Sequence, residues 1–144
     1  MAQGDSVLIT VALLLMGLEG SVPAESSVAS IINDCWKGRD HSGMSACVEM
    51  RAKEAQASLS QAEQAASDAI ASSKDEPDFP KYRSDTEAGL SRAPGAFAKY
   101  RKSECAYEAA LASKGNGADD VRLACIALLS EERAQHIQVT QPVP

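Results

Sequence analysis

The sequence lacks the patterns that mark an enzyme, a β-sheet protein or a nucleic-acid binder. Its two histidines, His41 and His136, have no nucleophile elbow or glycine-rich oxyanion segment near them, so the setting that Ser-His-Asp chemistry needs is missing. No segment has a convincing strand pattern. The formal net charge of −6 disfavours nucleic acid or an anionic membrane as a partner and favours a basic protein. We therefore expect a non-catalytic, all-α protein that needs no cofactor.

The sequence also lacks an apolar run that would make a good membrane span. Residues 7–18 are apolar but have only the length of a signal-peptide core, and small residues follow as far as Ala24. Residues 1–6 contain no Lys or Arg, although signal peptides normally carry positive charge there. We expect residues 1–24 to be a signal peptide cleaved near Ala24. No cysteine stands just after the apolar run to carry a lipid anchor, so the expected mature protein is periplasmic or secreted, without a stable membrane anchor.

Four cysteines are present, and they fall as two pairs, Cys35 with Cys47 and Cys105 with Cys125. Each pair brackets a segment rich in turn formers, KGRDHSG in the first and GNG in the second. An even cysteine count favours disulfides and an oxidising compartment. Three connectivities are possible; this symmetry favours bonds within each pair, and the rival ties the N-terminal half to the C-terminal hairpin. Cys35, His41 and Cys47 could hold zinc, but their spacing is not that of a CxxC knuckle, and we expect no metal.

Residues 25–139 are expected to form one domain of helices separated by turns. Residues 28–33 are a short apolar lead-in that can be helical. A long helix is predicted over residues 45–73, where small apolar residues recur at steps of three and four; they are Ala55, Leu59, Ala62, Ala66 and Ala69. Pro77 and Pro80 end this helix in a central loop over residues 74–80.

The C-terminal half predicts further helices. A helical stretch over residues 84–92 should be kinked or ended by Pro94 before a helix over residues 96–113. On that helix four apolar residues share one stripe with Glu104, a carboxylate that needs a partner there; they are Phe97, Tyr100, Tyr107 and Leu111. A last helix is expected to reach about residue 137, capped by Asp119 or Asp120, with an inward face of Val121, Cys125, Leu128 and Leu129. Residues 140–144 should be a loose tail.

The two C-terminal helices can be aligned as an antiparallel hairpin. With residues 115–117 as the turn, facing residues should have numbers that sum to about 230, as those of Cys105 and Cys125 do. The same register places Phe97 opposite Arg133, which predicts an aromatic–guanidinium contact. It also places Arg101 within one turn of Glu132, which predicts a partly buried ion pair.

These residues resemble the LprI-type lysozyme-inhibitor family of small exported bacterial domains. The family pattern is an aromatic residue, two residues, Tyr-Arg, two residues, Glu-Cys, a Gly-rich turn, a second Cys and a leucine followed by a Ser- or Thr-Glu-Glu-Arg box. Here it is carried by Phe97, Tyr100, Arg101, Glu104, Cys105, Cys125, Leu129, Ser130, Glu131, Glu132 and Arg133. The match is best over residues 97–134 and looser over 35–134, where Cys35 and Cys47 fit the family's first pair.

The sequence departs from the family pattern in places. The family usually has Trp where Phe97 stands and commonly Gln at the position of Pro94. Its middle helix usually carries an Asp, a Leu-Asn pair and a Tyr that do not align with the Ala-rich helix here. The resemblance implies an all-helical domain and, for some members, inhibition of lysozyme.

Two functions remain open from the sequence. The first is a secreted inhibitor whose partner is a basic lysozyme, with contacts in exposed loops. The candidate contacts are Asp75, Glu76 and Asp78 in one loop and Asn116, Asp119 and Asp120 in another. Alternatively Lys74 or Lys114 reaches the catalytic carboxylates of the enzyme. The second function is a periplasmic accessory or structural module that binds another protein and is unrelated to lysozyme.

Overall fold

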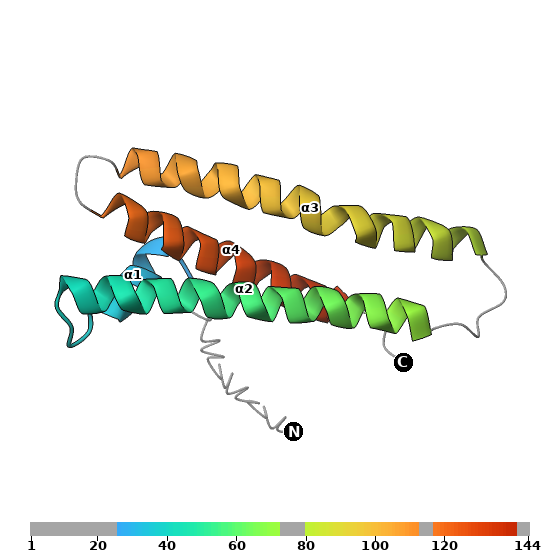
Figure 1. Ribbon diagram of the computed structural model, residues 1–144, viewed down its shortest axis with the longest axis horizontal. Coiled ribbons are helices and arrows are strands. Elements are labelled where there is room, and N and C mark those ends of the chain that lie inside the picture. The colour runs from blue at the N-terminus through green and yellow to red at the C-terminus, as the bar shows by residue number, and fades with distance from the viewer. Residues whose placement is uncertain (1–25, 73–79, 113–116, 141–144) are drawn as a thin grey trace, which may run out of the picture.

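The protein is an all-α bundle, as predicted. The computed structural model describes residues 26–72, 80–112 and 117–140, and these contain helices but no strand. The helices are α1 (Val28–Trp36), α2 (His41–Ser72), α3 (Pro80–Leu111) and α4 (Ala118–Thr140) (Figure 1). Across these described ranges, no helix combines the length and the apolar character needed to cross a membrane. The predicted signal peptide lies outside the described residues.

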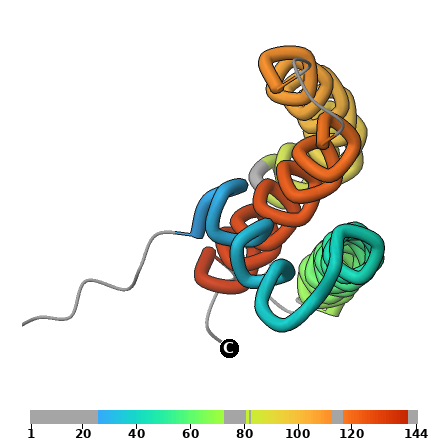
Figure 2. Tube along the Cα trace, turned by 90° about the vertical axis from the view of Figure 1, so that its left-hand side faces the viewer, coloured from blue at the N-terminus to red at the C-terminus, as the bar shows by residue number. Residues whose placement is uncertain are grey.

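Helix α4 is at the centre of the bundle. It packs most extensively along α2, and α3 and the short α1 pack on it as well (Figure 2). α1 also packs on α2, whereas α3 contacts α2 only slightly. α3 is therefore an outer helix, attached to the bundle mainly through α4.

The α2–α4 interface is built from small residues. The predicted face of α2 is buried at Ala55, Leu59, Ala62 and Ala66, while Ala69 is half-buried. Alanines of α4 join the same clusters; they are Ala124, Ala127 and Ala134. Side chains of this size let two helix backbones approach closely, so stability depends on tight packing more than on buried area per residue.

Helix α1 is longer than the predicted lead-in and has a capping box. The Ser27 hydroxyl accepts a hydrogen bond from the Ser30 backbone N–H at 3.1 Å, and the Ser30 hydroxyl accepts one from the Ser27 N–H at 2.8 Å. The helix buries Ile31 and Cys35. Gly38 follows with a φ of 71°, a left-handed conformation that favours glycine and lets the chain turn into α2.

Helix α3 excludes the alternative in which Pro94 ends the helix. It runs without interruption from residue 80 to residue 111, although a proline inside a helix typically costs about 3 kcal/mol. Leu90, one turn before Pro94, and Phe97, about one turn after it, both pack on the same apolar cluster. Anchors on both sides of the proline therefore hold the helix together.

Helix α4 also differs from its predicted ends. It begins at Ala118, so Asp119 and Asp120 lie in its first turn and are not its cap. It continues to Thr140, the first residue of the predicted loose tail. Of its predicted inward face, Cys125 is buried, whereas Val121, Leu128 and Leu129 are half-buried.

Candidate functional site

The hairpin of α3 and α4 is joined by a disulfide between Cys105 and Cys125. Their Cα atoms lie 5.4 Å apart, and both residues are buried. The second disulfide joins Cys35 and Cys47. Both predicted pairings are confirmed, and because Cys35 and Cys47 are bonded to each other they are not free thiolates for the alternative zinc site.

Phe97 is the centre of a cation–aromatic cluster between α3 and α4. The guanidinium carbon of Arg101 lies 5.6 Å from the ring centroid of Phe97, and that of Arg133 lies 5.8 Å away. The ring of Tyr100 is 6.3 Å from that of Phe97, centroid to centroid. The predicted contact of Phe97 with Arg133 is thus confirmed, and Arg101 adds a second cation. We call Phe97, Tyr100, Arg101 and Arg133 the Phe97 cluster.

The predicted ion pair between Arg101 and Glu132 is wrong. Arg101 Nη1 instead donates a 2.7 Å hydrogen bond to Oγ of Ser130, which donates in turn to the Ile126 carbonyl at 2.6 Å. Ser130 is completely buried, whereas Glu132 is exposed. Two residues along a helix are a rotation of roughly 200°, so Glu132 points away when Ser130 faces Arg101. The leucine-Ser-Glu-Glu-Arg box contains this serine, but only the rotation of α4 shows that it is the partner.

A stripe on α3 is exposed although its pattern is typical of a buried face. Tyr100, Tyr107 and Leu111 are 52%, 59% and 66% exposed. α3 meets α4 through the adjacent side of the helix, which carries Phe97, Arg101 and Cys105. Glu104 lies on the stripe and is half-buried, and it has no ion pair within the described parts of the chain. The family motif is therefore divided between a side that holds the hairpin and a side open to solvent.

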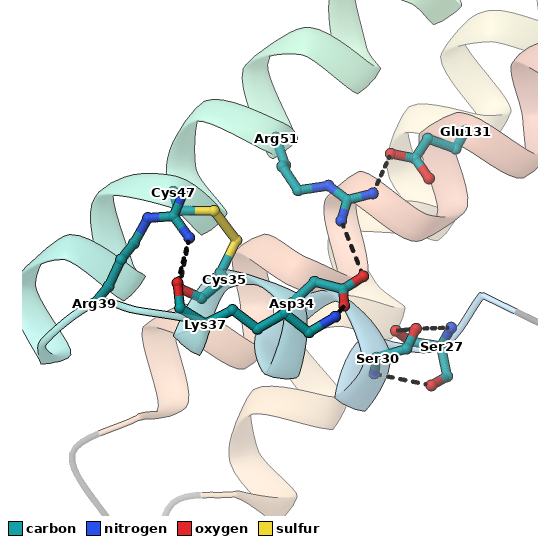
Figure 3. Close-up of polar contacts among 9 residues, drawn as sticks. All are labelled: Ser27, Ser30, Asp34, Cys35, Lys37, Arg39, Cys47, Arg51 and Glu131. Carbon is teal, nitrogen blue, oxygen red and sulfur yellow. Dashed lines mark hydrogen bonds and ion pairs between the residues drawn. A yellow bond between two sulfur atoms is a disulfide. The ribbon is translucent and has the colours of Figure 1, made fainter.

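The end of the bundle where α1 meets α2 has a separate polar network (Figure 3). Asp34 pairs with Lys37 at 2.5 Å and with Arg51 at 3.9 Å, and Arg51 lies 3.7 Å from Glu131 of α4. The hydrogen bond from Lys37 and its positive charge, with a smaller effect of Arg51, hold the pKa of Asp34 below its usual value. No sequence pattern pointed to this network, because its members come from three helices.

The structure describes only some of the residues that were predicted to contact a partner. Asp75, Glu76, Asp78 and Asn116 lie outside the described residues, as do Lys74 and Lys114. Asp119 is exposed and pairs with Arg122 at 2.7 Å.

The expectation that Asp120 is an exposed contact residue is wrong. It is only 6% exposed, and its carboxylate lies 3.8 Å from Nε2 of His41. It faces inward because it stands on the side of the first turn of α4 that meets the start of α2. The ring of His41 also contacts Trp36, 5.8 Å away in an edge arrangement.

Described residues form two grooves beside α3, and the lining of neither combines a histidine with a nucleophile. The first, of about 480 Å³, lies between α2 and α3 and is lined by residues that include Glu63, Glu87 and Leu90. The second, of about 370 Å³, is lined by apolar residues and by three cations and an amide; these polar residues are Arg101, Lys102, Arg122 and Gln56. Two of these cations already have partners, Ser130 and Asp119. Residues 26–72, 80–112 and 117–140 contain no group of three side chains suited to a metal ion.

Comparison with known proteins gives one family. The model of the family described as "Lysozyme inhibitor LprI" matches residues 35–137, a span that contains all four cysteines and more than two thirds of the 144-residue chain. No curated protein matches the chain, and no solved structure matches it.

Proposed function

The chain belongs to the LprI family of lysozyme inhibitors, and from that premise we propose that it is an exported, non-catalytic inhibitor that binds lysozyme and blocks peptidoglycan hydrolysis. The observation that carries this proposal is the family match over residues 35–137. The matched span includes both disulfides and the whole Phe97 cluster.

Export is the first part of the proposal. Two disulfides and no free cysteine are expected in a periplasmic or secreted protein, because thiols are kept reduced in the cytosol. Residues 1–24 would act as the signal peptide, with cleavage near Ala24. The inhibitor would then reach the compartment in which lysozyme attacks peptidoglycan.

Inhibition by binding is the second part. A bundle held by two disulfides loses little conformational freedom when it binds, so the entropy lost on binding offsets less of the interaction energy. The net charge of −6 favours encounter with a basic enzyme and raises the association rate. The residues proposed as contacts are Asp75, Glu76, Asp78, Asn116 and Asp119; Asp119 lies in the first turn of α4 and is paired with Arg122.

A lysis assay tests the proposal. The oxidised protein, purified from the periplasm of an expressing bacterium, should slow the lysis of peptidoglycan by at least one lysozyme class and co-elute with that enzyme at physiological salt. Association that survives only at low ionic strength would be unspecific attraction between an acidic and a basic protein. Failure to inhibit any lysozyme class would contradict the proposal and favour the accessory protein-binding module.

A further inference from the structure

The C-terminal half of α3 presents an exposed row of aromatic and acidic side chains. Tyr100, Glu104, Tyr107 and Leu111 are spaced by four, three and four residues, which places them on one side of the helix. We call these four residues the Tyr–Glu stripe. Its two tyrosines and its leucine are more than half exposed, so the stripe is available to a partner.

The charges of α3 are separated around the helix. Lys99 and Lys102 are exposed on the same helix, but their spacing from Glu104 turns both of them to the opposite side. Lys102 lines the groove that also contains Arg101 and Arg122. Arg101, three residues before Glu104, is instead bound to Ser130 and packs on Phe97, so the carboxylate of Glu104 has no cationic partner among the described residues.

Glu132 of α4 does not extend the stripe, because it points away from α3 when Ser130 faces Arg101. Glu132 is exposed and forms no ion pair in the described parts of the chain. It is the neighbour along the chain of Arg133, whose guanidinium packs on Phe97. Glu104 is therefore the carboxylate that the stripe itself offers to a partner.

Contacts with Phe97 and the neighbouring disulfide fix the position of the Tyr–Glu stripe. The ring of Tyr100 contacts Phe97, which lies beside the guanidinium groups of Arg101 and Arg133. The residue after Glu104 is Cys105, which is bonded to α4. A partner that binds this surface does not need to order it first, which lowers the cost of association.

The chemistry of the stripe suits a basic side chain. A guanidinium or ammonium group seated beside Glu104 could form a charge-assisted hydrogen bond with the carboxylate and stack on the faces of the tyrosine rings. We propose that the Tyr–Glu stripe is the surface through which this protein docks on a basic lysozyme, with Glu104 receiving an arginine or lysine of the enzyme. This inference rests on the proposed function and deepens it by assigning the docking surface.

A pair of double variants tests the assignment. Glu104→Gln with Tyr107→Ala removes the carboxylate and one ring of the stripe. Met50→Ala with Glu54→Gln is the matched control, because Met50 and Glu54 are an exposed apolar residue and an exposed carboxylate one turn apart on α2. The inhibition constant is measured for a c-type lysozyme or whichever class the unmodified protein inhibits, and circular dichroism checks that both variants are folded.

The stripe variant should inhibit about tenfold more weakly or worse, as expected for residues at the centre of an interface, and the control should inhibit like the unmodified protein. Tyr107→Phe, which keeps the ring, should retain inhibition. A photo-crosslinking side chain at Leu111 should capture the enzyme. Unchanged inhibition by the stripe variant, or an equal loss in the control, overturns the docking surface alone. An unmodified protein that inhibits no lysozyme overturns the proposed function, and the docking surface with it.

Discussion

Helices α3 and α4 are joined in one hairpin but are packed very differently. α4 contacts all three other helices and buries residues from Asp120 to Ile137. α3 is longer, yet Cys105 is its only buried residue among those whose exposure is described. The bundle therefore depends on α4 for its core. α3 is attached through one disulfide, the Phe97 cluster, the packing of Leu90 and a hydrogen bond from Arg83 to the Ile70 carbonyl, and it leaves most of its surface exposed.

The largest loss of stability should come from removing the disulfide that joins α3 to α4. Replacing Cys105 and Cys125 by Ala should lower the free energy of unfolding by about 3 kcal/mol, the entropic estimate for a loop of this size. Urea unfolding measures the loss, and hydrogen exchange should show that α3 loses protection well before α2 and α4.

The control for that variant is the other disulfide. Replacing Cys35 and Cys47 by Ala should destabilise the α1 end without changing the protection of α3 relative to α4. Equal loss of protection in all four helices after removal of Cys105 and Cys125 would contradict the separate attachment of α3.

Replacing an alanine by a larger residue should destabilise the protein in α4 but not in α3. Ala127 of α4 is completely buried, and Ala127→Leu should cost about 2 kcal/mol because the α2–α4 interface has no room for extra methyl groups. Ala110 of α3 is exposed, and Ala110→Leu should change the free energy of unfolding by less than about 0.5 kcal/mol. Thermal or urea unfolding compares the two, and similar losses would show that α3 is packed like α4.

Arg101 should matter for folding more than for binding. Arg101→Ala removes the hydrogen bond to Ser130 and one cation beside Phe97, and we expect a loss of about 1.5 kcal/mol. The lysozyme affinity of the folded variant should fall less than that of Glu104→Gln with Tyr107→Ala. An Arg101→Ala protein of unchanged stability that no longer binds lysozyme would place Arg101 in the interface instead.

The smallest effect belongs to Asp34 at the α1 end. Lys37 and, to a smaller extent, Arg51 hold its pKa below its usual value, so its contribution to stability is present above the pKa of the unfolded state and is lost as the pH falls through that of the folded state. The stability difference between the unmodified protein and Asp34→Asn should therefore shrink as the pH falls below about 3.8. Unfolding curves across acidic pH measure it, and a difference that does not change with pH would show that these ion pairs do not act on stability.

The fold could be predicted from local patterns, but the exposure of α3 could not. The spacing of Ala55, Leu59 and Ala62 gave the buried face of α2, and the symmetry of the cysteines gave both disulfides and the hairpin register. The same periodicity grouped Tyr100, Tyr107 and Leu111 on one side, but periodicity shows which residues share a face and not whether another helix covers it.

The interaction partners of charged residues could not be predicted from the sequence either. Arg101 was expected to pair with Glu132. The rotation of α4 about its axis instead turns Ser130, two residues earlier, toward Arg101, so the guanidinium binds a hydroxyl and not a carboxylate. Arg51 bridges Asp34 and Glu131 from three different helices, a contact that depends on how the helices pack. Asp120 is buried for the same reason, since its surroundings are set by the approach of α2.

Hydroxyl-radical footprinting of the protein in its complex with lysozyme tests the central claim most directly. Tyr107 and Leu111 of α3 are exposed side chains that hydroxyl radicals oxidise, and Trp36 of α1 and Met50 of α2 are exposed, oxidisable references; each residue is compared with its own labelling in the free protein. We predict that lysozyme protects Tyr107 and Leu111 from oxidation and leaves Trp36 and Met50 unchanged. Protection of Trp36 or Met50 with unchanged labelling of Tyr107 and Leu111 would contradict the assignment of the outer side of α3 as the docking surface.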